Sequence, residues 1–149
     1  MQREIKFRVY NLSGEFKMLY VNELTWAKHA DGLVRMHFGA DIEFGENGVS
    51  VHSGFGLADG SENYGWCLMQ YTGLKDKNGV EIYEDDVVKG YIPNQEDDDD
   101  LPFGHVKFAE GEFNIWKGDK YLGELYGCVI NKSIEVIGNI YEHSELKTN

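Results

Sequence analysis

The sequence predicts an all-β protein with one or two short helices, and three features of the chain favour this fold class. Several short segments alternate between apolar and polar side chains, which is the pattern of a strand with one buried face. These segments are rich in β-branched and aromatic residues, and aromatic residues make up 13% of the 149-residue chain. The chain has 18 glycines but only 2 prolines, which favours many tight turns between short paired strands.

The first predicted element is a hairpin at the amino terminus. Glu4–Tyr10 alternates strictly between polar and apolar residues and predicts a half-buried strand. Asn11–Gly14 has the composition of a turn, and Phe16–Val21 follows as the return strand. The next stretch, Glu23–His37, is compatible with a short helix or with a strand, because its apolar spacing suits a helix but Gly32 interrupts it.

The middle of the chain predicts loops around short strands. Gly39–Gly65 is rich in Gly, Ser, Asp and Asn, and Val49–His52 is a short predicted strand within it. Trp66–Tyr71 is apolar and predicts the next strand. Asn78–Gly79 then predicts a type I′ hairpin turn, because both residues tolerate positive φ, and Asp86–Ile92 predicts the strand that follows.

The second half of the chain predicts a small five-stranded SH3-like barrel, with the amino-terminal hairpin packed against it. We expect one domain over residues 1–149, with 1–67 and 68–149 as candidate substructures. Residues 93–102 are predicted to form a flexible acidic loop, because five consecutive acids repel one another. Tyr121–Val129 is compatible with a strand or with irregular structure. The other strands predicted after the acidic loop are His105–Phe108, Glu112–Trp116 and Ile134–Tyr141.

Charge and hydropathy argue against two classes of partner. The net charge of −12 disfavours nucleic acid and anionic membranes, because both are themselves negatively charged. The Lys and Arg residues are scattered, and no apolar run approaches the roughly 20 residues that span a bilayer. Cys67 and Cys128 form no CxxC motif and predict two buried thiols in a reducing compartment. We therefore expect a soluble cytoplasmic protein.

The sequence contains no motif that indicates catalysis, a metal or a cofactor. The acids between Asp76 and Asp86 are interpreted as turn-forming and solvated charges rather than as a carboxylate pair for acid–base catalysis. No two of the five histidines have the spacing of zinc ligands. A nucleophile elbow and a phosphate-binding glycine loop are both missing. We expect no enzymatic activity, no metal and no cofactor.

Three blocks of the sequence carry a resemblance to a known family: Leu68–Val88, Arg3–Tyr10 and Glu135–Leu146. Leu68–Val88, the most specific block, resembles the signature of the YopX family of phage and prophage proteins, and the other two are similar to that family's terminal blocks. The blocks occur in the family's order, so the resemblance covers the chain from end to end, with residues 27–65 and the acidic loop unmatched. It implies an all-β protein that acts in the cytoplasm of a bacterial host, and it supplies no biochemical mechanism.

The chain departs from the family's pattern at two positions. Asp85 stands where the family usually has glycine, and this departure argues against a positive-φ turn at that position. Ser144 stands where proline is common, which predicts a looser tail.

Four residues are candidates for a binding cleft or a subunit interface: Arg8, Gln70, Thr72 and Tyr83. For the last three the favoured interpretation is structural, as groups that form hydrogen bonds around the predicted turn and cap the barrel. Our leading hypothesis is a non-enzymatic module for protein interaction or self-assembly, whose partner is a second copy or a host or phage protein. The alternatives are an acidic nucleic-acid mimic that inhibits a host DNA-binding protein, and a β-barrel that binds nucleic acid directly.

Overall fold

The structure, a computed structural model, describes residues 4–11, 18–28, 34–42, 49–52, 56–57, 66–93 and 103–146. The chain divides into an N-terminal unit, Lys6–Met69, and a C-terminal unit, which combines Met1–Ile5 with Gln70–Asn149. Regular structure in the described residues is almost entirely β-strand, with one short α-helix and one 3₁₀ turn. The predicted all-β class is therefore confirmed.

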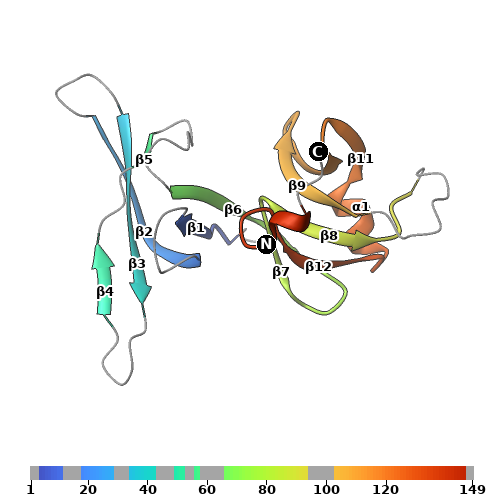
Figure 1. Ribbon diagram of the computed structural model, residues 1–149, viewed down its shortest axis with the longest axis horizontal. Helices are drawn as coiled ribbons and strands as arrows, with labels where there is room; N and C mark the ends of the chain where they lie inside the picture. The colour runs from blue at the N-terminus through green and yellow to red at the C-terminus, as the bar shows by residue number, and fades with distance from the viewer. Residues whose placement is uncertain are drawn as a thin grey trace. The chain divides into compact units, whose positions relative to one another are not determined.

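The N-terminal unit is built on a sheet with the strand order β4-β3-β2-β1-β6, and a short β5 pairs with β3 (Figure 1). β1 and β2 form the predicted amino-terminal hairpin, in which Val9 lies opposite Leu19, and both side chains are buried. Cys67 and Met69 of β6 are buried as well. The strands are β1 (Phe7–Asn11), β2 (Met18–Lys28), β3 (Val34–Ile42), β4 (Val49–His52), β5 (Gly56–Leu57) and β6 (Trp66–Lys75), of which Trp66–Met69 belongs to this unit.

The helical interpretation of Glu23–His37 is wrong. β2 continues to Lys28 and pairs with β3, for example at Thr25 opposite His37. A short helix is marginal by itself, whereas a strand gains a partner for its backbone groups from the neighbouring strand. The predicted strand Val49–His52 is confirmed as β4. Residues 12–14 of the predicted turn and 94–102 of the predicted acidic loop lie outside the described residues.

The C-terminal unit contains a five-stranded antiparallel sheet with the order β11-β10-β9-β8-β12. Figure 1 shows β8 and β12 side by side in this unit, with α1 close to them. A second, smaller pairing joins the Gln70–Lys75 part of β6 to β7. The elements are β7 (Glu81–Tyr83), β8 (Asp86–Gly90), β9 (Phe103–Ala109), β10 (Glu112–Lys117), β11 (Lys120–Glu124), α1 (Leu125–Ile130), β12 (Ile134–Asn139) and η2 (Ser144–Leu146).

The hydrophobic core of the C-terminal unit lies between this sheet, β7 and α1. Its members are almost completely shielded from solvent, and α1 contributes Leu125 and Cys128. Burial of such aliphatic side chains contributes roughly 1.5–3 kcal/mol each and is the main force that closes the unit. The core cluster consists of Ile82, Val88, Ile92, Val106, Ile115, Leu122, Leu125, Cys128 and Ile134.

The predicted barrel is present as an open sheet, not as a closed barrel. Its strand order follows the predicted course of one strand, a long connection, a hairpin and a last strand, but β11 and β12 are edge strands that do not pair in the described part of the chain. Helix α1 occupies the connection between them and buries Leu125 and Cys128 in the core. This helix shields apolar surface that closure of the barrel would otherwise have to cover. The packing of the amino-terminal hairpin against the barrel stays a prediction.

The type I′ turn predicted at Asn78–Gly79 is wrong, and this turn geometry occurs instead at Glu110–Gly111. Both residues of that pair have positive φ, 56° and 92°, and they join Ala109 directly to Glu112. In the hairpin between β6 and β7 only Gly79 has positive φ, at 83°. The Gly79 N–H donates to the Asp76 carbonyl and the Asp76 N–H donates to the Val80 carbonyl. This pattern is that of a three-residue loop with a bulged glycine.

Helix α1 was not predicted, because Tyr121–Val129 was interpreted as a strand or as irregular structure. The strand interpretation holds only as far as Glu124, where β11 ends and the six-residue helix begins. Tyr126, Gly127 and Val129 have low helix propensity, and six residues are too few for a helical period to be visible. Tertiary burial of the helix's inner face therefore decides its conformation.

Candidate interaction site

The tip of the sequence block Leu68–Val88, which we call the signature hairpin, is organised by the buried carboxylate of Asp76. Asp76 is 7% exposed, and its Oδ1 accepts hydrogen bonds from the N–H groups of Asn78 at 2.8 Å and Val80 at 2.9 Å. Its Oδ2 accepts the N–H of Val136 at 2.9 Å, across 60 positions of sequence. Asp76 thus fixes the turn and attaches it to the last strand of the sheet.

The tip of the signature hairpin also covers the outer edge of β12. The Lys77 N–H donates to the Ile134 carbonyl at 3.2 Å, next to the bond between Asp76 and Val136. The Lys77 ammonium lies 2.8 Å from the Glu135 carboxylate, and this hydrogen bond lowers the pKa of Glu135. Because the ion pair is partly exposed, it adds little to stability. The backbone bonds matter more, since an open strand edge would be free to pair with another chain.

Three of the four predicted binding residues lie in this hairpin, and the structure gives each a local bond. The Gln70 N–H donates to Glu84 Oε2 at 2.9 Å. The Thr72 hydroxyl donates to the Ile82 carbonyl at 2.8 Å, and the Tyr83 hydroxyl donates to a neighbouring carboxylate, that of Glu81. Thr72 and Tyr83 are 7% and 2% exposed. They therefore brace the hairpin, and neither presents its side chain to solvent.

The fourth predicted residue, Arg8, is placed in the other unit. It lies in β1 opposite Tyr20 and is 8% exposed. Gln70, Thr72 and Tyr83 belong to the C-terminal unit. Nothing in either unit taken by itself gathers these four residues into one site.

A pocket that was not anticipated lies in the C-terminal unit between β11, α1 and the end of the segment that follows β8. It has a volume of about 370 Å³, and Pro93, Tyr121 and Glu124 form part of its wall. A volume of this size is within the range of ligand-binding pockets. Gly127 of α1 also lines it, and a Cβ added there would meet no atom within 4 Å. Gly127 and Tyr121 share the pocket because the chain turns from β11 into α1 between them. No local sequence pattern indicates this turn.

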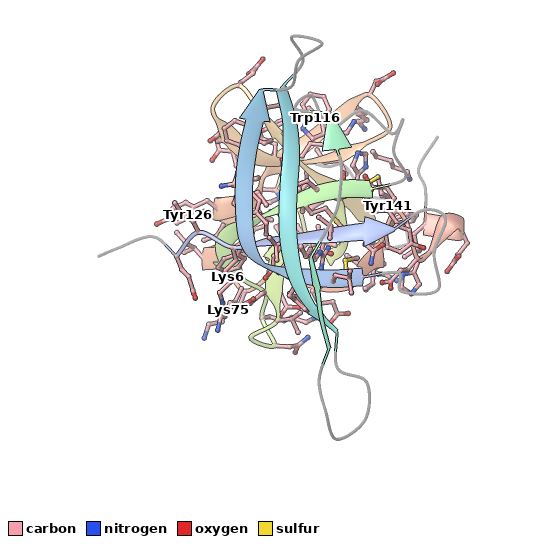
Figure 2. All side chains as sticks on the ribbon, turned by 90° about the vertical axis from the view of Figure 1, so that its left-hand side faces the viewer. Lys6, Lys75, Trp116, Tyr126 and Tyr141 are labelled. Carbon is pink, nitrogen blue, oxygen red and sulfur yellow. The ribbon has the colours of Figure 1, made fainter. Side chains whose placement is uncertain are left out.

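Large apolar side chains are exposed on two of these segments, α1 and the segment that follows β8. Tyr91 is 61% exposed, and on α1 the residues Tyr126 and Ile130 are 63% and 57% exposed. These two are four positions apart, so they lie on the same side of the helix. Figure 2 shows Tyr126 extending outward from the helix, on the opposite side of this unit from Tyr141. Segments that line the pocket thus also carry apolar side chains that are not used for the core.

A sequence profile of the YopX protein family matches residues 6–147. The chain belongs to the YopX family. The family resemblance of its three sequence blocks is confirmed, and their described residues lie at structurally important positions such as Asp76. No curated protein matches the chain.

The fold of this YopX protein is similar to that of a solved structure along nearly its whole length. The crystal structure of protein EF1440 from Enterococcus faecalis covers 97% of this chain and 99% of its own, with a TM-score of 0.58 and 23% sequence identity. At this identity the likeness shows the fold alone.

The electrostatics of the pocket are set by burial and by nearby acids. The pKa of the Tyr121 phenol is raised by desolvation and then by the negative charges of Glu124 and Glu112. The pKa of the Cys128 thiol is raised by burial, which a hydrogen bond with Ser133 partly offsets. The Cys128 thiol therefore stays neutral near pH 7. The negative charge at the rim of the pocket comes from the acidic side chains near Tyr121, such as Glu124.

In the part of the chain that the structure describes, no group of three or more His, Cys, Asp and Glu side chains is arranged to hold a metal ion. Glu84 has a pKa raised mainly by burial, but its carboxylate accepts the Gln70 N–H and is used by the hairpin. In the same described part, no helix is long and apolar enough to cross a membrane.

The argument against a positive-φ turn at Asp85 is wrong. Asp85 has φ of 62°, and it holds this conformation between β7 and β8. Its N–H donates to the Val106 carbonyl, its carbonyl accepts the Ile140 N–H, and its carboxylate accepts the Tyr141 hydroxyl at 2.8 Å. Aspartate tolerates the left-handed region better than most residues. These bonds therefore hold the turn without glycine.

We expect Asp85→Gly to be nearly neutral and Asp85→Ala to be clearly destabilising. Both lose the bond to Tyr141, worth about 1 kcal/mol, but glycine also removes the left-handed strain of about 1 kcal/mol, which alanine retains. Urea unfolding followed by circular dichroism should rank the glycine variant above the alanine variant. Tyr141→Phe is the control that removes only the hydroxyl, and equal stabilities for the two Asp85 variants would contradict the expectation.

We expect stability to fall as the pH drops below about 6.5, because of His105. This residue lies in β9 opposite Val87 and Trp116 and is 8% exposed. Burial and then the charge of Lys107 lower its pKa from 6.5 to about 4. The unfolded chain therefore takes up the proton first on acidification, and the folded state loses about 2 kcal/mol between pH 7.5 and pH 5.0.

The measurement is urea unfolding at these two pH values for the wild type and for His105→Gln. The glutamine variant does not titrate in this range, so its free energy of unfolding should change less with pH by about 2 kcal/mol. Identical pH dependence in the two proteins would show that His105 does not cause the effect.

Proposed function

We propose that this YopX protein is a non-enzymatic protein-interaction module that acts in the cytoplasm of a phage-infected or lysogenic bacterium. The observation that carries the proposal is the exposure of Tyr91, Tyr126 and Ile130 on the segments that also line the 370 Å³ pocket. Aromatic side chains supply much of the binding energy of protein interfaces. Large exposed apolar side chains beside a pocket are characteristic of a docking surface.

The polar groups of the signature hairpin also support a non-enzymatic role, because they are used to hold the fold together. Asp76, Thr72 and Tyr83 carry its most conspicuous polar groups, and each is bonded to a neighbouring part of the hairpin or to β12. A polar group that already holds the fold together is poorly suited to change its bonding during a reaction. Tyr91, Tyr126 and Ile130, the exposed side chains on which the proposal rests, lie outside this hairpin.

The experiment compares the wild type with the double variant Tyr126→Ser/Ile130→Ser. Sedimentation velocity measures self-association, and affinity capture from host cells with quantitative mass spectrometry measures partners. We expect the wild type to form dimers or to capture a defined protein, and we expect the double variant to lose that association while keeping its circular dichroism spectrum. A monomeric wild type whose captured proteins equal those of the double variant would overturn the proposal.

A further inference from the structure

The pocket beside α1 is an aromatic and apolar space with a negative charge at its wall. Tyr121 is 45% exposed and contributes an aromatic ring, and Pro93 and Leu122 contribute apolar surface. Glu124 is the acidic residue among those that line it. A group that matches this lining must have an apolar stem and a positively charged head.

The Glu124 carboxylate is available for such a group. Glu124 is the N-cap residue of α1, yet its side chain makes no capping hydrogen bond. The residue is exposed. A carboxylate that is not engaged at the helix end can therefore pair with a cation brought by a partner.

The acids around Tyr121 add to the same charge. Glu124, Glu112 and Glu110 all act on the phenol and disfavour its ionised form, as a negative potential does. The exposed Lys117 is directed elsewhere, since its ammonium lies 5.2 Å from the centre of the Phe103 ring. The chain as a whole carries a net charge of −12, which attracts basic partners over a longer range.

We propose that this pocket receives an arginine side chain from a basic segment of a protein partner, with the guanidinium stacked on Tyr121 and paired with Glu124. Arginine fits better than lysine, because its planar head stacks on an aromatic ring and binds a carboxylate through two parallel hydrogen bonds. The inference rests on the proposed function, since it names the chemistry of the partner that the interaction module recognises.

The test uses three pentapeptides that differ only in their central residue. Acetyl-Gly-Gly-Arg-Gly-Gly-amide is titrated into ¹⁵N-labelled protein, and the same peptide with citrulline in place of arginine is the neutral control. We expect the arginine peptide to shift the amide signals of Tyr121, Glu124 and Gly127, the citrulline peptide to bind about tenfold more weakly, and a lysine peptide to fall between them.

Three variants assign the binding to the pocket. Glu124→Gln removes the charge without changing the shape and should weaken the arginine peptide about tenfold. Gly127→Leu should block the pocket, because Gly127 lines it and a Cβ at this position would meet no atom within 4 Å. Glu145→Gln, at an exposed position on η2, removes one negative charge elsewhere and should leave the affinity unchanged.

Equal binding of the arginine and citrulline peptides, or equal affinity of Glu124→Gln and the wild type, would overturn this inference. The peptide titration is independent of Tyr126 and Ile130, the two residues whose replacement tests the proposed function. If the arginine peptide fails to bind but the association lost in the double variant is real, the interaction module stands and only its arginine pocket is refuted.

Discussion

Replacing Gly90 by alanine is expected to destabilise the C-terminal unit by about 4 kcal/mol, the largest effect of any single methyl group that we anticipate. Gly90 has φ of 148° and pairs with Ile134 across β8 and β12. A Cβ there would collide with the carbonyl oxygen of Ser133 and lie 2.9 Å from the Cα of Ile134. Both obstacles are backbone atoms, so a side-chain rotation cannot relieve the collision.

The matched control for this prediction is Gly79→Ala. Gly79 also has positive φ, at 83°, but a Cβ there would meet no atom within 4 Å. Alanine at position 79 therefore introduces only backbone strain, about 1 kcal/mol. Urea unfolding followed by circular dichroism measures both variants. Similar losses at the two positions would mean that the close approach of β8 and β12 is not what requires Gly90.

Asp76→Ala is expected to cost about 3 kcal/mol, because it removes the acceptor of three backbone N–H groups at once. The N–H groups of Asn78 and Val80 lie at the exposed tip and can bond to water, whereas that of Val136 lies on β12 and loses its acceptor. We expect most of the loss to come from the bond to Val136, since the hairpin tip covers this edge of β12 and a covered donor without an acceptor is the costly case.

Asp76→Asn separates the turn from the long-range bond. The asparagine oxygen can still accept the two N–H groups of the turn, but its NH₂ group then faces the Val136 N–H and cannot accept it. We expect a loss of about 2 kcal/mol, together with faster hydrogen exchange at Val136 and slow exchange retained at Val80. Asp119→Ala, at an exposed turn between β10 and β11, is the control and should change stability by less than about 0.5 kcal/mol. Equal effects at positions 76 and 119 would show that Asp76 is not the attachment of the hairpin.

Gly90 lies outside the three family blocks and allows β8 and β12 to approach each other. Within the family blocks, Asp76 attaches the signature hairpin to β12. Asn139 acts similarly in the carboxyl-terminal block, where its Oδ1 accepts the N–H groups of Tyr141 and Glu142. The described polar residues of these blocks therefore specify the fold, and the proposed binding surface lies on β11 and α1 outside them.

Strand alternation was sufficient to predict the all-β class and several of the elements. The amino-terminal hairpin, the strand at Val49–His52 and the pair joined at Glu110–Gly111 were each readable from the chain, because a strand with one buried face has a period of two residues. The turn types were less readable. Asn78–Gly79 has the preferred composition of a type I′ turn, but the carboxylate of Asp76 selects a different loop.

The sequence by itself determined that the chain forms short strands separated by glycine turns, and its three blocks determined the family. Only the tertiary structure decided that Glu23–Lys28 is part of a strand, that Leu125–Ile130 is a helix, and that Tyr121, Glu124 and Gly127 share a pocket. The physical reason is that periodicity reports which face of a segment is apolar, whereas the conformation of short segments depends on partners far away in sequence. The bond between Asp76 and Val136, 60 positions apart, is such a partnership, and no local pattern contains it.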